Sequence, residues 1–262
     1  MVPTKIIGEQ TCGLVKSGAR VLEVFELFYE ARRPLRAVDI GSALHFPKSS
    51  TVELLKTLVE TGYLSFDTDA KTYFPSFRMV RFGSWLSDHY YDGNRVNDLM
   101  RHLNEETGLA TALSMQNGRR MQFLVILRAS ETETLQAEAE YVSEGLKMPI
   151  IGSAAGSALL MTKPEHTIAA IYAGAMGLRS ECIPRLELDY ILGLVRKFKR
   201  RGYATNFRAV VPEVSSVAMP LPCRPGRPQL ILGCGAPTRE WSAERERDLA
   251  EVLGAAIRRF MG

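Results

Sequence analysis

A lysine and several hydroxyl side chains are grouped within one stretch of this sequence, from Pro47 to Leu64. Lys48, Ser49 and Ser50 directly follow a proline, and Thr57 comes two helical turns later. Such groups at the start of a helix donate hydrogen bonds to phosphate oxygens, which the helix dipole also attracts. We expect this face to contact DNA, although on an isolated helix the same residues would only form a capped, solvated surface.

One acidic residue and two further basic residues belong with this group. Glu53 either accepts a hydrogen bond from the amino group of a cytosine or only repels phosphate, and the sequence does not choose between these roles. Arg36 and Lys71 are candidate phosphate contacts, with a solvated surface charge as the alternative for each. The net charge of +4 permits nucleic-acid binding without requiring it. The prediction of DNA binding therefore depends on the helices and strands around these residues.

A second group lies in the small-residue run from Gly152 to Gly156, which precedes an apolar segment. Small side chains let another chain segment or a ligand approach the backbone closely. One interpretation is tight packing of a helix on a sheet. The other is that the N–H groups at the start of this helix bind a ligand carboxylate, while Met148 and Ile150 supply apolar contacts. We favour ligand binding.

The cysteines offer little for catalysis or metal binding. They are spread along the chain, at Cys12, Cys182, Cys223 and Cys234. They form no C-x-x-C pair and lack neighbouring histidines, which is typical of reduced thiols. Cys223 or Cys234 could pair with His102 or His166, but none of these residues lies in a recognisable nucleophile motif. We expect no catalytic residue, no cofactor and no structural metal.

Three short helices are predicted around the first group. Helical spacing of apolar residues indicates helices over 18–31 and 37–44, and a third begins at or just after Pro47 and ends at Gly62. Ser49 or its neighbour is expected to cap the third helix. The predicted inward positions are Val38, Ile40 and Leu44 in the second helix, and Val52, Leu55, Leu58 and Val59 in the third.

A β-hairpin is predicted directly after these helices. Two short aromatic-rich segments, 63–67 and 71–75, flank a polar turn. Three helices followed by such a wing make a winged helix-turn-helix, whose third helix enters the major groove of DNA. We assign residues 1–77 to this DNA-binding domain.

Residues 93–262 are predicted to form a second domain of the α+β class. A helix ending at Gly108 precedes two alternating strands that are joined by Asn117-Gly118, a strong hairpin signal. Further strands are indicated over 214–222 and 229–235, and a closing helix follows a cap at Ser242. Helices flanking a mostly antiparallel sheet define the class.

Between these domains, residues 78–92 are predicted to form a linker helix. Its Phe82, Trp85 and Leu86 are expected to pack against a partner chain or the neighbouring domain, with a dimer contact favoured, because such large side chains are rarely left in water along one stripe. No apolar run reaches the roughly 18–20 residues that span a bilayer, so we expect no membrane partner. The first residues lack the features of a secretion signal, and we expect a cytoplasmic protein.

Five segments together resemble the IclR family of transcriptional regulators, and the resemblance runs from about Val15 to Phe260. The segment P-K-S-S-T-V-E-L-L-K-T-L-V-E-T-G-Y-L, from Pro47 to Leu64, is similar to the family's recognition helix and first wing strand. The segment K-M-P-I-I-G-S-A-A-G-S-A-L-L is similar to the signature loop and helix of its effector domain. The others are R-G-Y-A (201–204), P-E-V-S-S-V-A-M-P (212–220) and L-I-L-G-C-G (230–235).

The resemblance implies a GAF-like effector domain, a homodimer or a dimer of dimers, and control of a catabolic operon through a double-stranded DNA operator. It assigns the effector pocket to Met148, Ala154, Ala155, Asn206, Val214, Ser216, Leu232 and Cys234. Asn206 stands where the family has an acidic residue, which removes a charge that would repel an anion. A small organic acid is therefore the expected effector.

Other departures from the family pattern prevent the transfer of ligand and operator. Ser216 replaces a frequent cysteine and Glu213 a usual glycine in the sensor, while Glu53 replaces a frequent basic residue and His45 the helix-turn-helix glycine.

Two other functions stay open. One is an architectural DNA-binding protein whose second domain only oligomerises and holds no ligand cavity, and the less favoured one is a cysteine-dependent enzyme.

Overall fold

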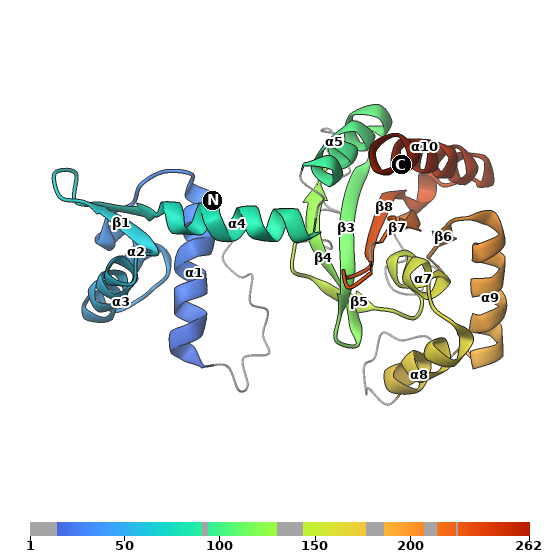
Figure 1. The fold of residues 1–262 in the computed structure, drawn as a ribbon, viewed down its shortest axis with the longest axis horizontal. Coiled ribbons are helices and arrows are strands. Elements are labelled where there is room, and N and C mark those ends of the chain that lie inside the picture. The colour runs from blue at the N-terminus through green and yellow to red at the C-terminus, as the bar shows by residue number, and fades with distance from the viewer. Residues whose placement is uncertain (1–14, 91–93, 130–143, 177–185, 207–213, 224) are drawn as a thin grey trace. The chain divides into compact units, whose positions relative to one another are not determined.

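The computed structural model describes residues 15–90, 94–129, 144–176, 186–206, 214–223 and 225–262. They form two compact units, divided between Asp88 and His89. The N-terminal unit has one hydrophobic core and the C-terminal unit has two, and Figure 1 labels their α-helices and strands. None of the helices in these described ranges is long and apolar enough to cross a membrane.

The N-terminal unit is a winged helix-turn-helix. Its elements are α1 (Lys16–Ala31), α2 (Ala37–Ala43), α3 (Lys48–Glu60), β1 (Leu64–Asp67), β2 (Thr72–Pro75) and the start of α4 (Phe77–Tyr90). β1 and β2 pair antiparallel, and a bridge between Leu35 and Tyr73 ties the wing to the segment before α2. The Asp67 carboxylate accepts the backbone N–H groups of Ala70 and Asp69 at 2.9 Å each, which lowers the pKa of Asp67. The predicted helices and wing are confirmed.

The core of this unit differs from the predicted one at two valines. Ile40, Leu55 and Leu58 are buried as expected, but Val38 is 64% exposed and Val52 is 44% exposed. Thr51 takes the interior position in α3 at 1% exposure. Its hydroxyl donates to the Pro47 carbonyl at 3.0 Å, which removes the cost of burying an unpaired polar group.

The start of α3 also departs from the expected capping. Pro47 is the N-cap residue and provides no side-chain hydrogen bond, so Ser49 is not the cap. Instead, the Ser50 hydroxyl donates to the Pro47 carbonyl, as Thr51 does. Gly62 has a φ of 78° and follows the helix as predicted, because this left-handed conformation suits glycine.

The C-terminal unit is built on a six-stranded antiparallel sheet with the strand order β5-β4-β3-β8-β7-β6. The strands are β3 (Ala110–Asn117), β4 (Arg120–Leu127), β5 (Lys147–Pro149), β6 (Ala204–Thr205), β7 (Val214–Pro220) and β8 (Leu230–Pro237). The helical elements are α5 (Arg95–Thr107), α7 (Ala154–Met161), α8 (Glu165–Met176), α9 (Leu188–Arg201), η1 (Thr238–Glu240) and α10 (Ala243–Met261). The α+β class is confirmed.

Helices cover both faces of this sheet. Figure 1 shows α5 and α10 on one side of the sheet, and α7, α8 and α9 on the other. Alternate residues of β8 divide between the two cores: Leu232 packs toward α5 and α10, whereas Ile231 packs toward α7 and α9. Which face of the sheet a side chain occupies therefore decides which set of helices it meets.

Arg201 fastens the end of α9 to its surroundings. Its guanidinium donates to Glu246 of α10 at 2.8 Å, to the Thr205 hydroxyl at 2.9 Å and to the Tyr203 carbonyl at 2.9 Å. It also lies 4.0 Å from the centre of the Tyr203 ring. The R-G-Y-A segment thus holds a structural junction between α9, β6 and α10.

Candidate DNA-binding surface and effector site

The outward face of α3 begins with unpaired backbone donors. Thr51 is the first residue of α3 whose N–H reaches a helical carbonyl, that of Pro47. Among the described residues, the N–H groups of Lys48, Ser49 and Ser50 have no acceptor. The Lys48 side chain is exposed beside them. This end of α3 therefore presents donors and a positive charge to an anion.

The predicted DNA-contacting side chains of α3 are not equally available. The hydroxyls of Ser50 and Thr57 already donate to the carbonyls of Pro47 and Glu53. The Ser49 hydroxyl and the exposed Glu53 carboxylate have no hydrogen-bond partner in the part of the chain that the structure describes. Lys71, also predicted, is exposed in the wing turn with a φ of 56°.

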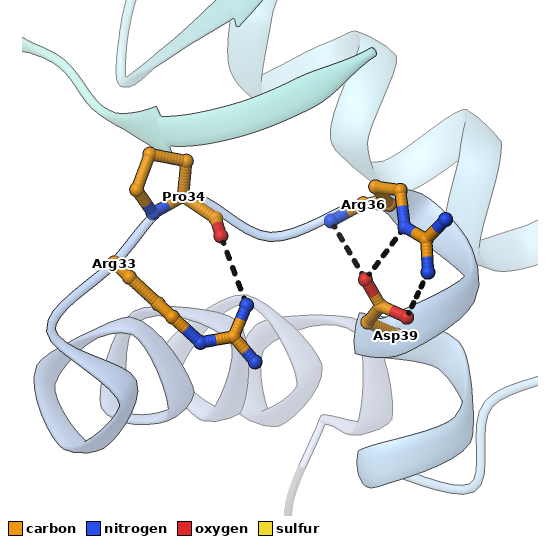
Figure 2. A network of polar contacts seen from close by, with 4 residues as sticks. All are labelled: Arg33, Pro34, Arg36 and Asp39. Carbon is orange, nitrogen blue, oxygen red and sulfur yellow. Dashed lines mark hydrogen bonds and ion pairs between the residues drawn. The ribbon is translucent and has the colours of Figure 1, made fainter. Parts of the chain in front are cut away.

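Arg36 is held by an acidic neighbour that the sequence analysis did not identify. Figure 2 shows the two-pronged ion pair, with Arg36 Nε 3.0 Å from Asp39 Oδ2 and Nη2 3.1 Å from Oδ1. This hydrogen bonding lowers the pKa of Asp39 and raises that of Arg36. A phosphate must compete with Asp39 for this guanidinium. Arg36 precedes α2 and Asp39 lies three residues later inside it, and this spacing in the sequence could have indicated the pair.

The start of α7 is capped by Ser153. Its hydroxyl accepts the Gly156 N–H at 3.1 Å and donates to the Pro149 carbonyl at 2.6 Å. The N–H groups of Ala154 and Ala155 have no acceptor among the described residues, and these residues are 6% and 8% exposed. Nearly buried, unpaired donors at the positive end of a helix favour an anionic ligand.

Gly156 shows that the small-residue run also serves packing. A Cβ atom at Gly156 would lie 1.9 Å from the Ile150 carbonyl oxygen. The backbone of the preceding loop therefore crosses this helix where only glycine fits. Close packing explains Gly156, while the unpaired N–H groups of Ala154 and Ala155 are compatible with ligand binding. Both interpretations of the small-residue run therefore apply.

Small residues occupy the sheet face that α7 covers. Ser216 pairs with Gly235 and Ala218 with Gly233, so the side-chain positions of each pair share one face. Ala218 belongs to the core beneath α7, which identifies this face as the α7 side. Several of its positions are half-exposed, among them Ala110, Ala112, Val214, Ser216, Gly233 and Gly235. On the same face Ala218 and Ile231 are buried at 1% and 0% exposure, so the partial exposure is local.

The structure divides the predicted effector residues between two faces. Leu232 and Cys234 belong to the core beneath α5 and α10, at 0% and 1% exposure, so they do not share a surface with Ser216. Their glycine neighbours lie on the α7 side, since successive strand residues point to opposite faces. Met148 lies on β5, at the edge of the sheet opposite β6.

Asn206 forms a bracket at the end of β6. Its Nδ2 donates to the Val214 carbonyl at 2.6 Å, and its Oδ1 accepts the Ser216 N–H at 3.1 Å. The amide oxygen and one amide hydrogen are thereby used to hold β7. One N–H of the carboxamide remains as a donor.

The cysteines and histidines of the described residues form no catalytic arrangement. Burial raises the pKa of the Cys234 thiol to about 11, and its contact is the Thr111 hydroxyl at 3.6 Å. A thiol that stays neutral at pH 7 is a poor nucleophile. His102 lies against Glu106 and the Phe260 ring. Within the described ranges, no three His, Cys, Asp or Glu side chains are grouped to hold a metal.

A winged helix-turn-helix and a separate α+β unit with unpaired donors at the start of α7 are typical of a DNA-binding transcription regulator with a sensor unit. Comparison with protein families gives the same result. A model of the IclR helix-turn-helix domain matches residues 17–68, and a model of the bacterial transcriptional regulator IclR C-terminal region matches residues 94–260. The chain belongs to the IclR family of transcriptional regulators, which bind DNA and effector ligands.

Individual relatives are distant but extend over most of the chain. The HTH-type transcriptional regulator XynR of Escherichia coli K12 is 22% identical over 79% of this chain and 81% of the relative. BhcR of Paracoccus denitrificans is 22% identical over 96% of this chain and 88% of the relative. The crystal structure of Thermotoga maritima IclR matches with a TM-score of 0.66 at 16% identity, covering 94% of this chain and 97% of that one. These proteins are regulators, in agreement with the expectation that the chain is not an enzyme.

Proposed function

We propose that the protein is a dimeric, ligand-responsive regulator of a catabolic operon, and that its effector is a small organic acid. The observation that carries the effector class is the pair of N–H groups at Ala154 and Ala155, which have no acceptor among the described residues although these residues are nearly buried. A carboxylate satisfies both donors and the helix dipole at once. A cationic ligand would leave both N–H groups unpaired.

The proposed effector surface is the α7 side of the sheet. It combines the N–H groups that begin α7 with the Ser216 hydroxyl, the spare N–H of Asn206 and the backbone at Gly233 and Gly235. No acidic side chain is among these residues, which suits an anion.

The DNA-binding role rests on α3 and the wing. Lys48, Ser49 and the unpaired N–H groups at the start of α3 bind phosphate, and Lys71 of the wing turn is a second phosphate contact. One recognition helix reads too few base pairs for adequate specificity, so a dimer on two half-sites is required. Ligand and operator are coupled if the acid changes operator affinity, typically by about 5- to 150-fold.

Operator binding is tested by gel shift with the full chain on the promoter beside its own gene. We expect Lys48→Ala to weaken binding to all sequences alike and to reduce the slope of log affinity against log salt by about one. A change of base preference in this variant would contradict the phosphate role. Arg36→Ala is the comparison, and we expect a smaller effect because Asp39 already engages that guanidinium.

Effector binding is tested by calorimetry with a panel of aliphatic and aromatic carboxylic acids and matched neutral amides. We expect one or more acids to bind, and Ser216→Leu to abolish binding, because a larger side chain at this half-exposed position would occupy the proposed site. Cys234→Ala is the control, because it alters a predicted pocket residue that lies on the other face. Loss of binding in Cys234→Ala alone would overturn the site, and binding of the amides alone would overturn the acid. Binding of neither class would favour an architectural protein whose second unit only oligomerises.

A further inference from the structure

Val52 is an apolar side chain on the polar, outward face of α3. We infer that Val52 determines part of the operator sequence by contacting the C5 methyl group of a thymine. The inference rests on the proposed DNA-binding role of α3, and it adds which base α3 recognises and through which residue.

The rotation of α3 places Val52 on the outward face. Thr51 and Leu55 are 1% and 0% exposed and fix the inward side, while Val52 is 44% exposed. Along the outward side, Ser49, Val52 and Lys56 follow one another at spacings of three and four residues, with exposed Glu53 beside them. Val52 is therefore central on the surface proposed to meet DNA.

The position of Val52 along α3 separates it from the phosphate contacts. The unpaired N–H groups and Lys48 occupy the first turn of the helix. Val52 is the fifth residue of α3, in the second turn. In a helix-turn-helix, residues in the N-terminal part of the recognition helix reach the base edges in the major groove. Val52 is thus placed to contact a base edge, and its apolar side chain cannot donate a hydrogen bond to a phosphate.

The chemistry of the groove selects one partner for this side chain. Thymine is the only base that presents a methyl group in the major groove, and the other bases offer hydrogen-bond donors and acceptors there. Valine is stiff about its first side-chain torsion, so little freedom is lost when its methyl groups pack against that methyl. The neighbouring Glu53 carboxylate repels acceptor atoms, which adds discrimination against guanine at the same position.

A second exposed valine provides a matched control. Val38 on α2 is 64% exposed, so its substitution removes the same two methyl groups from the same unit. It is not on α3, and we expect it to leave base preference unchanged. If exposure of valine only served association between copies, Val38→Ala and Val52→Ala would both act on oligomeric state and neither on base preference.

The test begins with selection of duplexes from a random DNA library by the full chain. Each thymine of the selected consensus is then replaced singly by deoxyuridine, which lacks only the C5 methyl group. We expect one thymine in each half-site at which this replacement weakens wild-type binding about fourfold, the value of one buried methyl group. With Val52→Ala, the same replacement should change affinity less than twofold, whereas Val38→Ala should behave as wild type.

Three results would overturn the inference. One is equal sensitivity to deoxyuridine in the wild type and Val52→Ala, and another is the same loss of sensitivity in Val38→Ala. The third is the absence of any selected consensus, which removes the proposed operator binding as well and is thereby distinguished from the first two. Thermal unfolding of Val52→Ala confirms that the variant is folded, as expected for a truncation at a half-exposed position.

Discussion

In α3 the polar Thr51 is buried and the apolar Val52 is exposed, the reverse of what their polarity suggests. A threonine can be buried in α3 because its hydroxyl donates to the Pro47 carbonyl one turn earlier, so no unpaired polar group results. Val52 is then turned outward, although it has the more apolar side chain. The apolar spacing of α3 predicted Val52 as an inward residue, but the buried residue is its neighbour Thr51. A threonine beside a predicted inward residue can therefore occupy the interior instead of it.

His45 holds a strained backbone conformation in the turn between α2 and α3, with a φ of 54°. The left-handed region costs a residue with a Cβ atom about 1–2 kcal/mol, whereas glycine adopts it freely. Replacing His45 by glycine removes this strain, but glycine also makes the unfolded chain more flexible, which offsets part of the stabilisation. We expect His45→Gly to raise the free energy of unfolding by about 0.5–1 kcal/mol.

Urea unfolding of the full chain, followed by circular dichroism, measures this change at His45. His45→Ala is the control, because it removes the imidazole but retains the Cβ atom, and we expect no stabilisation from it. A gain of the same size in both variants would attribute the effect to the imidazole instead of the backbone.

Helix α7 depends on the close approach of the loop that precedes it. The Ile150 carbonyl occupies the place of a side chain at Gly156, and the contact is with backbone atoms that cannot rotate away. We expect Gly156→Ala to destabilise the C-terminal unit by about 1–3 kcal/mol or more, as overpacking does. It should also weaken effector binding, because the start of α7 must shift.

Gly193 in α9 is the matched control for that substitution. A Cβ atom there meets nothing within 4 Å, and the residue is exposed. We expect Gly193→Ala to stabilise the protein by about 0.5–1 kcal/mol through helix propensity alone. Thermal unfolding of both variants decides the matter, and a stable, fully ligand-binding Gly156→Ala protein would show that the loop moves aside without cost.

Helix α4 carries several large, exposed apolar side chains, among them an exposed tryptophan. Phe77 is 74% exposed and Trp85 is 63% exposed, while Phe82 stacks on Tyr63 of its own unit at 6.1 Å. Exposed apolar surface of this kind marks a site of association. We expect Trp85→Ala to shift the protein toward smaller species in analytical ultracentrifugation and to weaken operator binding.

Tyr190 of α9 serves as the control for Trp85, since it is a comparably exposed aromatic residue at 54%. We expect Tyr190→Ala to leave the sedimentation profile unchanged. If Trp85→Ala and the wild type sediment alike at every concentration, the proposed dimer contact through α4 is withdrawn.

The sequence alone determined the order of elements, since capping residues, turn residues and apolar spacing act locally. It therefore predicted the three helices and wing, the Asn117-Gly118 hairpin and the α+β class. The tertiary structure decided which faces meet. A shift of one residue along a strand moves a side chain to the other side of the sheet, which is why Gly233 and Gly235 lie on the α7 side in place of Leu232 and Cys234. The bracket formed by Asn206 likewise depends on a strand eight residues away, which no local pattern specifies.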